Sequence, residues 1–388
     1  MIKGLEKEKL PLYQENGVTV ESVVYKDISG LLVYFENPPV HPIGEKEIKA
    51  LNNAFDKISK EVIEKGEPYK FLIFHRRNDP YQVGADVKEF EGDVDPEWAE
   101  KHTKEGVELN NKIRILSKYL KTISTFTGFN WGGSIEVPIM FNYVIGDSRS
   151  TAQFSEVELG IIPGWVGVVN TAIKAGIINA EYMAKTGKRV DAEELYRIGI
   201  FDLLVDVRIP SPNRPPKPRE KDFSKHEEYE MAMKQYEQDL IKYKKELDDH
   251  HKETYKELMP VALEFAISDE VPKLSPEDRL ILKSKLKFFY EVRERVNPDN
   301  YKGIAGKLKS DVRKELEEKG GLPLAPGAVH AIDLLVEDML GFSSEEIKES
   351  SGYFGMNEAL LCNGLMQTDN RKEGIDAVRK GRVAKFKK

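Results

Sequence analysis

The sequence predicts an α/β fold with parallel strands, because short apolar runs alternate with helical patterns and with glycine-rich motifs. Residues 31–35 are apolar and rich in strand formers, and a Pro-Pro pair ends that run. Residues 45–65 have the apolar spacing of an amphipathic helix, which ends at Gly66. Residues 71–74 then form a short strand of the buried type.

The same alternation continues toward the middle of the chain. A second helix is expected around residues 97–120, and residues 122–126 form a strand that enters a glycine-rich motif. Residues 135–141 continue as a buried helix, and residues 144–146 form another short strand. These elements extend the predicted layers of strands and helices.

The composition changes at Arg208. Residues 209–219 carry five prolines and read as an extended connector, and residues 221–256 are dominated by charged residues and tyrosine at helical spacing. We expect a long solvated helix that packs along one narrow stripe, followed by helices around 277–296 and 306–319. The predicted division is a core (1–207), a helical insertion (208–320) that influences oligomerisation or substrate access, and a C-terminal helical region (321–388).

The overall composition excludes several classes of protein. Apolar residues make up 40% of the 388 residues, which is enough for a core, and the net charge of −7 argues against a nucleic-acid partner. A single cysteine, Cys362, excludes an internal disulfide framework. The start of the chain has no apolar signal core, and no stretch approaches the length of a membrane span. We therefore expect a soluble cytoplasmic protein that does not enter a membrane.

We expect no metal site, because the adjacent His250 and His251 would point apart on a helix.

Two glycine motifs offer backbone N–H groups. Gly84 lets the chain turn sharply and present the Ala85 N–H outward, although an ordinary strand-to-helix turn capped by Asp86 explains the same residues. Gly133 stands at the start of a predicted helix, where free amides and the helix dipole favour a negative oxygen. Glu136 then lies on the first helical turn, as a catalytic carboxylate or as a helix-capping one.

A second carboxylate, Glu156, lies twenty positions beyond Glu136 in a mostly apolar context. If this segment is extended, Glu156 and Glu158 point to one face; if it turns, only one of them enters the site. Paired carboxylates can hold and activate one water molecule between them. The residues that follow, ending at Gly164, are expected to close the wall of the pocket.

Taken together, these motifs resemble the crotonase (enoyl-CoA hydratase/isomerase) superfamily, in the same order along the chain. The resemblance covers about two thirds of the chain, and Glu156 rather than Glu158 falls on the family's second carboxylate. The matching motifs are Gly-Ala-Asp-x-Lys-Glu at 84–89, Gly-Gly-x-x-Glu at 132–136, Gly-Ile-Ile-Pro-Gly at 160–164, and further stretches at 186–192, 199–202, 370–375 and 384–387.

The resemblance implies a spiral of ββα turns that binds acyl-CoA thioesters. It assigns the N–H groups of Ala85 and Gly133 to an oxyanion hole for the thioester oxygen, and assigns Glu136 and Glu156 to the reacting water. It implies no cofactor beyond the coenzyme A of the substrate, and a homotrimer or dimer of trimers. The residues that it places around the substrate are Asp86, Lys88, Gly164 and Trp165.

The sequence also departs from the family pattern. Trp165-Val166-Gly167 replaces the common Ala-Gly-Gly, so the Trp165 ring narrows the pocket, offers a flat face to a ring substrate, or only packs in the core. Because both glutamates are present, we predict an enoyl-CoA hydratase, a lyase. The alternatives are an enoyl-CoA isomerase, a hydrolase that opens an alicyclic oxo-enoyl-CoA as some longer relatives do, and a non-enzymatic oligomeric scaffold.

Overall fold

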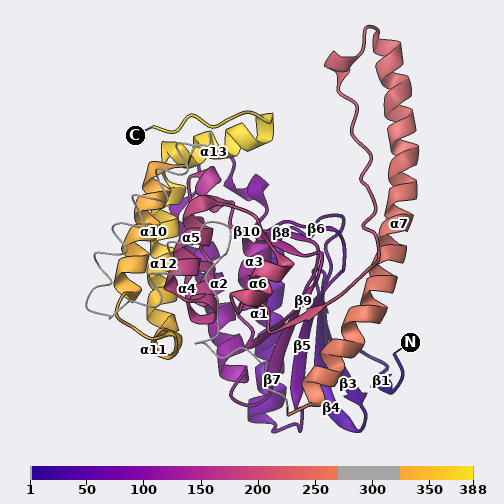
Figure 1. The fold of residues 1–388 in the computed structure, drawn as a ribbon, viewed down its shortest axis with the longest axis vertical. Helices are drawn as coiled ribbons and strands as arrows, with labels where there is room; N and C mark the ends of the chain where they lie inside the picture. The colour runs from indigo at the N-terminus through magenta and orange to yellow at the C-terminus, as the bar shows by residue number, and fades with distance from the viewer. Residues whose placement is uncertain (1, 270–323, 388) are drawn as a thin grey trace.

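The computed structural model describes residues 2–269 and 324–387, and it confirms an α/β fold with a parallel sheet and a helical C-terminal region (Figure 1). The helices expected at 277–296 and 306–319 lie outside the described residues. Among the helices that are described, none is long and apolar enough to cross a membrane.

The main sheet has eight strands in the order β1-β3-β4-β5-β7-β9-β12, with β2 paired to β3. The pairs from β4 to β12 are parallel, as predicted, and the pairs among β1, β2, β3 and β4 are antiparallel. The first three strands were not predicted, although the alternating apolar residues of β3 signal a strand. The strands are β1 (Leu5–Lys7), β2 (Tyr13–Glu15), β3 (Val18–Tyr25), β4 (Ile28–Phe35), β5 (Phe71–Arg76), β7 (Lys121–Phe126), β9 (Tyr143–Asp147) and β12 (Leu203–Val205).

A second, four-stranded sheet runs in the order β11-β10-β8-β6. Each turn of the chain gives one strand to the main sheet and the next strand to this small sheet, as in the consecutive pairs β5 and β6, β7 and β8, and β9 and β10. This is the spiral of ββα turns that was predicted. The strands are β6 (Tyr81–Gln82), β8 (Phe129–Trp131), β10 (Thr151–Gln153) and β11 (Val190–Asp191).

Helices follow these strands and cover the sheet. The predicted helix at 45–65 is α1 (Glu45–Ser59) and continues into a short π-helical turn, Lys60–Glu64. The next helix, α2 (Pro96–Leu116), begins at Asp95, whose carboxylate accepts the N–H of Glu97. The remaining helices before the connector are α3 (Gly133–Ile139), α4 (Gly167–Ala175), α5 (Ile177–Thr186) and α6 (Ala192–Arg197).

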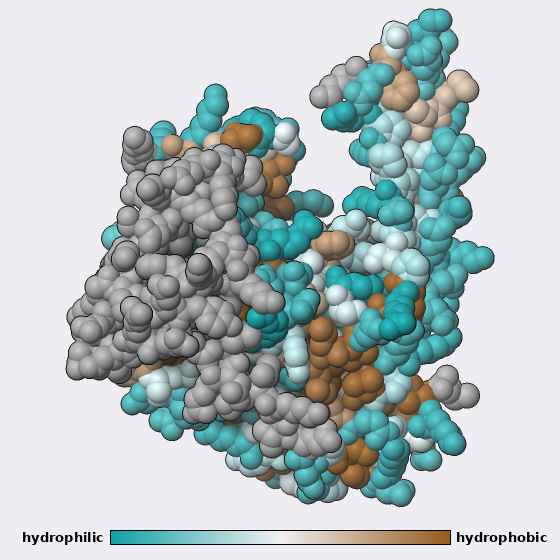
Figure 2. All heavy atoms as spheres, in the orientation of Figure 1, coloured by the Kyte–Doolittle hydropathy of each residue, from teal (hydrophilic) through white to brown (hydrophobic). Residues whose placement is uncertain are grey.

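The long charged helix is α7 (His226–Ile267), and its two halves have different surroundings. Its first half projects beyond the body of the molecule beside the proline-rich connector (Figure 1), and Figure 2 shows mostly hydrophilic side chains there. Its second half packs on the main sheet, where Leu258 and Leu263 are fully buried against side chains of β3, β4 and β5. The expected narrow buried stripe is therefore present on α7, and in the second half of the helix it becomes a broader contact with the sheet.

Polar contacts join α7 to the ends of the strands as well. The Tyr255 hydroxyl lies 3.0 Å from that of Tyr34, and the Asn78 N–H donates to Nδ1 of His251 at 3.1 Å. His250 instead lies 3.1 Å from the Pro210 carbonyl oxygen, so the two adjacent histidines point to different partners, as their spacing predicted.

Replacing Leu258 with alanine is expected to destabilise the whole fold by about 2–5 kcal/mol, because it empties part of the contact between α7 and the sheet. The matched control is Ile241→Ala on the projecting half of the helix, where the side chain is 70% exposed and the change should be within about 0.5 kcal/mol. Urea unfolding of both variants measures the difference. Equal stability of the two variants would show that α7 does not belong to the folded core.

The described part of the C-terminal region folds into four helices, of which three pack on α2, α4 and α5 and the last packs on the 3₁₀ helix Glu156–Leu159. Their apolar faces share one core with the segments that follow β10 and with α4. Figure 1 shows these helices on the side of the molecule away from α7. They are α10 (Pro326–Met339), α11 (Ser344–Glu349), α12 (Ser351–Met366) and α13 (Asp369–Lys380).

Candidate active site

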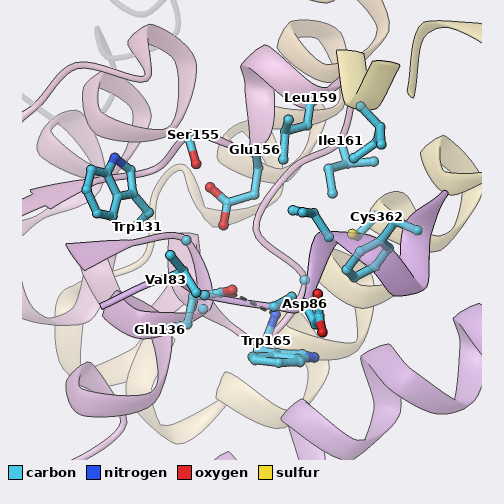
Figure 3. A pocket seen from close by; sticks show the side chains of 18 of the residues that line it. Val83, Asp86, Trp131, Glu136, Ser155, Glu156, Leu159, Ile161, Trp165 and Cys362 are labelled. Atoms are coloured by element: carbon cyan, nitrogen blue, oxygen red, sulfur yellow. Dashed lines mark hydrogen bonds between the residues drawn. The ribbon is translucent and has the colours of Figure 1, made fainter. Parts of the chain in front are cut away.

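A cavity of about 540 Å³ lies where the glycine motifs, the segment after β10 and the helices α2, α12 and α13 meet. Figure 3 shows Glu136 and Glu156 pointing into this cavity from different sides, with the Trp165 ring along its wall. The structure brings together all eight residues that the sequence predicted for the site, and they are Ala85, Asp86, Lys88, Gly133, Glu136, Glu156, Gly164 and Trp165.

Two backbone N–H groups meet at one side of the cavity. Ile43 pairs with Ala85 through bonds to the flanking residues: its N–H donates to the Gly84 carbonyl at 3.0 Å, and its carbonyl accepts from Asp86 at 3.3 Å. The Ala85 N–H therefore points away from Ile43. A Cβ atom at Gly84 would overlap the Gly133 nitrogen, so only glycine lets these two backbone segments come so close.

The second N–H group belongs to the first residue of α3. Gly132, which precedes it, has a φ of +52°, a conformation that other residues rarely adopt, and Gly133 starts the helix as predicted. Among the described residues, no hydrogen-bond acceptor is seen for the N–H of Ala85 or Gly133. These two donors are therefore free to bind an oxygen of a ligand together.

Glu136 is a buried carboxylate on the first turn of α3, and it does not cap its own helix. Its Oε1 atom accepts the N–H of Trp165 at 2.8 Å and of Gly167 at 3.1 Å, both from the turn that leads into α4. The capping alternative is thus wrong for Glu136. Burial raises the pKa of Glu136 to about 7, while the two amide donors favour its ionised form.

Glu156 begins a short 3₁₀ helix, Glu156–Leu159, directly after β10. It is buried, and its Oε2 atom has no hydrogen-bond partner among the described residues. Burial and then the nearby charge of Glu136 raise the pKa of Glu156 well above its ordinary value. Its own backbone N–H offsets this shift only in part, so Glu156 holds its proton more tightly than Glu136 does.

The segment that carries Glu156 turns rather than extends, but the turn does not keep Glu158 out. Glu158 also lines the cavity, and it accepts a hydrogen bond from Gln153 at 3.4 Å. The expectation that a turn would admit only one of the two carboxylates is therefore wrong. A 3₁₀ helix places residues i and i+2 about 120° apart, a divergence small enough for both side chains to reach a wide cavity.

Asp86 and Lys88 lie at the mouth of the cavity. The Asp86 carboxylate accepts the N–H of Lys88 at 3.1 Å and caps the 3₁₀ helix Val87–Phe90, so the capping role suggested for it is confirmed. The Asp86 cap leaves the Ala85 N–H free. The capped turn and the presented N–H group are therefore both present in the same motif. The Lys88 side chain is exposed.

Trp165 both packs in the core and forms the cavity wall. Its indole is 3% exposed and donates from Nε1 to the His102 carbonyl at 3.1 Å. One face of the ring lies against Gly133, where a Cβ atom would come within 2.7 Å, and another part lies against Gly106 of α2. The ring therefore narrows the cavity beside the two free N–H groups.

Several lining residues were not identified from the sequence. They include Trp131 from β8, His102 from α2 and Cys362 from α12. Cys362 is buried, and its place beside Gly164 depends on how α12 packs. Trp131 lies inside the glycine motif, and its position next to Gly132 was the one sequence signal that it lines the cavity.

Within the described residues, no group of three or more His, Cys, Asp or Glu side chains is arranged to hold a metal ion.

Comparisons with known proteins show a family match and a similar fold. Residues 31–208 match the model of the enoyl-CoA hydratase/isomerase family. The fold is similar to that of an enoyl-CoA hydratase from Rhodobacter sphaeroides 2.4.1, with a TM-score of 0.57, 14% identity, and coverage of 100% of this chain and 93% of that one. An enoyl-CoA hydratase from Bacillus anthracis aligns with 15% identity over 96% of this chain and 99% of that one, at a TM-score of 0.47. DspI from Pseudomonas aeruginosa aligns with 20% identity over 53% of this chain and 74% of that one, at a TM-score of 0.41.

Proposed function

From the match of residues 31–208 to the enoyl-CoA hydratase/isomerase family, we propose that the chain is a crotonase-superfamily hydratase that adds water across the α,β double bond of an enoyl-CoA thioester. The observation that carries the proposal is the placement of two buried glutamates and two free N–H groups around one cavity. Hydration needs a base for the water, an acid for the α carbon, and donors for the thioester oxygen.

The difference between the two glutamates supports a division of roles. Glu136 accepts two amide hydrogen bonds and is the easier of the pair to ionise, whereas Glu156 has only its own backbone N–H as an amide donor, lies near the charge of Glu136 and retains its proton. Glu136 therefore takes a proton from water as the hydroxide oxygen bonds to the β carbon. The electron pair of the double bond moves toward the thioester oxygen, and Glu156 then donates its proton to the α carbon.

The N–H groups of Ala85 and Gly133 stabilise the negative charge on the thioester oxygen in this step. They lie at the start of a helix and beside a tight turn, and the surrounding wall is largely apolar, so their dipoles are weakly screened. The net change is one water added and no bond to coenzyme A broken.

Incubation with a panel of linear and cyclic enoyl-CoA thioesters tests the function. Loss of the conjugated thioester absorbance, with a product heavier by one water, is the expected result. Ring opening of an oxo-enoyl substrate would instead create a new carboxylate and add a further water, and isomerisation would leave the mass unchanged. Absence of any change across the panel would favour the scaffold alternative.

The rate of hydration is expected to fall below about pH 7, by about tenfold for each pH unit, because protonated Glu136 cannot accept a proton from water. The sign follows from the raised pKa of Glu136: its reactive, ionised form is lost as the pH drops through that value. A second fall is expected at alkaline pH, when Glu156 loses the proton that it must donate. A pH profile of kcat/KM measures both limbs, with enzyme returned to neutral pH as the control for stability. An acid limb near 4.5, the ordinary value for a glutamate, would contradict the assignment of Glu136 as the base.

A further inference from the structure

A third carboxylate, Glu358, is buried behind the site and lies outside the segment that the family model matches. It comes from α12 and is fully buried, and its two oxygens accept the N–H groups of Val168 at 3.2 Å and Val169 at 3.0 Å. These are amides of the first turn of α4, where free N–H groups and the helix dipole favour a negative charge.

The amides that lead into α4 interact with two buried glutamates, and the Gly167 N–H interacts with both. Trp165 and Gly167 donate to Glu136, and the next two residues along the chain donate to Glu358. Any movement of the start of α4 away from Glu358 would therefore also move the donors of Glu136. No ion pair with a lysine or arginine is seen for either glutamate within the described residues. Burial, and then the charge of Glu136, raises the pKa of Glu358 well above its ordinary value, and the amide hydrogen bonds offset this shift only in part.

The residue between the two amides that donate to Glu136 is held in an unfavourable conformation. Val166 has a φ of +67° and a ψ of +23°, the left-handed region that a β-branched residue avoids. Such a residue costs roughly 1–3 kcal/mol, so the surrounding structure must hold it in place. The Val166 side chain packs against Gly355 of α12. A Cβ atom at Gly355 would come within 3.1 Å of both Val166 methyl groups, so glycine leaves the space for this contact.

The same face of α12 continues along this turn. Gly355, Glu358 and Cys362 are spaced three and four residues apart and therefore lie on one side of the helix. Cys362 packs against Gly164, at the other end of the turn, where a Cβ atom would lie 2.8 Å from its sulfur. One face of α12 thus contacts the turn at its beginning, its strained centre and the start of α4.

We propose that Glu358 is a positioning residue, which holds the start of α4 so that the amides of Trp165 and Gly167 remain directed at Glu136. The proposal rests on the proposed function in so far as Glu136 is the base, but the placement of the amides is independent of the reaction. Other titratable groups around Glu136 are Glu156 and Cys362, whose pKa values burial raises. On α2, His102 lies against Trp165 and is neutral, because burial lowers its pKa to about 4.

Two substitutions of Glu358 distinguish its role in positioning the amides from any effect of its own charge on Glu136. In Glu358→Gln one oxygen becomes an NH₂ group that cannot accept an amide hydrogen bond, and in Glu358→Asp the carboxyl group remains but the shorter side chain withdraws from the amides. Both should loosen the donors of Glu136 and raise its pKa, so that the acid limb of kcat/KM moves to higher pH by about one unit, a loss of about fivefold at pH 7 that approaches tenfold at lower pH. The matched control is Glu346→Gln, an exposed capping residue of α11 that lies in the same C-terminal region.

Infrared spectroscopy of the carboxylic acid band that Glu136→Gln removes gives the protonation of Glu136 directly. This readout requires no turnover, so it tests the positioning even if the protein does not hydrate enoyl-CoA thioesters. An upward shift of the midpoint in both Glu358 variants, with none in the control, is the expected result. A downward shift in Glu358→Gln alone would show that Glu358 acts only through its charge, and an unchanged midpoint in folded variants would exclude a role at Glu136. Either outcome would overturn the proposal.

Discussion

Replacing Glu136 or Glu156 with glutamine is expected to lower kcat by about 10²–10⁴-fold, the usual contribution of a positioned proton-transfer group. Glutamine keeps the size of the side chain but can neither accept the proton of water nor donate one to the α carbon. Both side chains point into the same cavity, so each loss should appear with one enoyl-CoA substrate (Figure 3). Steady-state kinetics at the optimal pH of each variant measures it.

Glu158→Gln is the natural comparison for this pair, because Glu158 lines the same cavity and is bound to Gln153. Its loss of kcat should be much smaller than that of Glu156→Gln. Binding of a saturated acyl-CoA should change little in all three variants, since the carboxylates act on the double bond. If Glu158→Gln lost more activity than Glu156→Gln, the roles of these two residues would have to be exchanged.

Removing one of the two free N–H groups should have the second largest effect. Gly133→Pro deletes the donor at the first position of α3, where proline is compatible with a helix, and should lower kcat by about 10²–10³-fold. The measurement is kcat with an enoyl-CoA substrate, after circular dichroism has shown that the variant is folded.

Steric effects have to be separated from the loss of the N–H group, because any side chain at position 133 meets the Trp165 ring at 2.7 Å. Gly133→Ala introduces the same first carbon but keeps the N–H, so it is the matched control. The ratio of the two variants, rather than either value alone, measures the contribution of the donor. Equal rates in the alanine and proline variants would remove the Gly133 N–H from the mechanism.

The sequence by itself determined the fold class, the alternation of strands and helices between residues 31 and 146, and eight of the residues that meet at the cavity. These features depend on local physical constraints, such as alternating apolar runs in strands and a glycine where the backbone must come close or adopt a positive φ. Gly84 and Gly132 meet such constraints in the structure, and Ala85, Gly133 and Glu136 follow them within a few residues. Each motif is local, but the residues that the motifs identified meet at one cavity although they are far apart in the chain.

The tertiary structure decided which groups those residues contact. The sequence near Glu136 allowed a helix cap, but the fold directs its carboxylate to amides from the start of α4, 29 and 31 residues away. Glu358 lies more than 200 residues beyond Glu136 and carries no local signal, since an isolated glutamate on a helix is usually solvated. Burial, and with it the pKa of each glutamate, arises only when distant helices pack around the same cavity, and no local spacing in the chain specifies that packing.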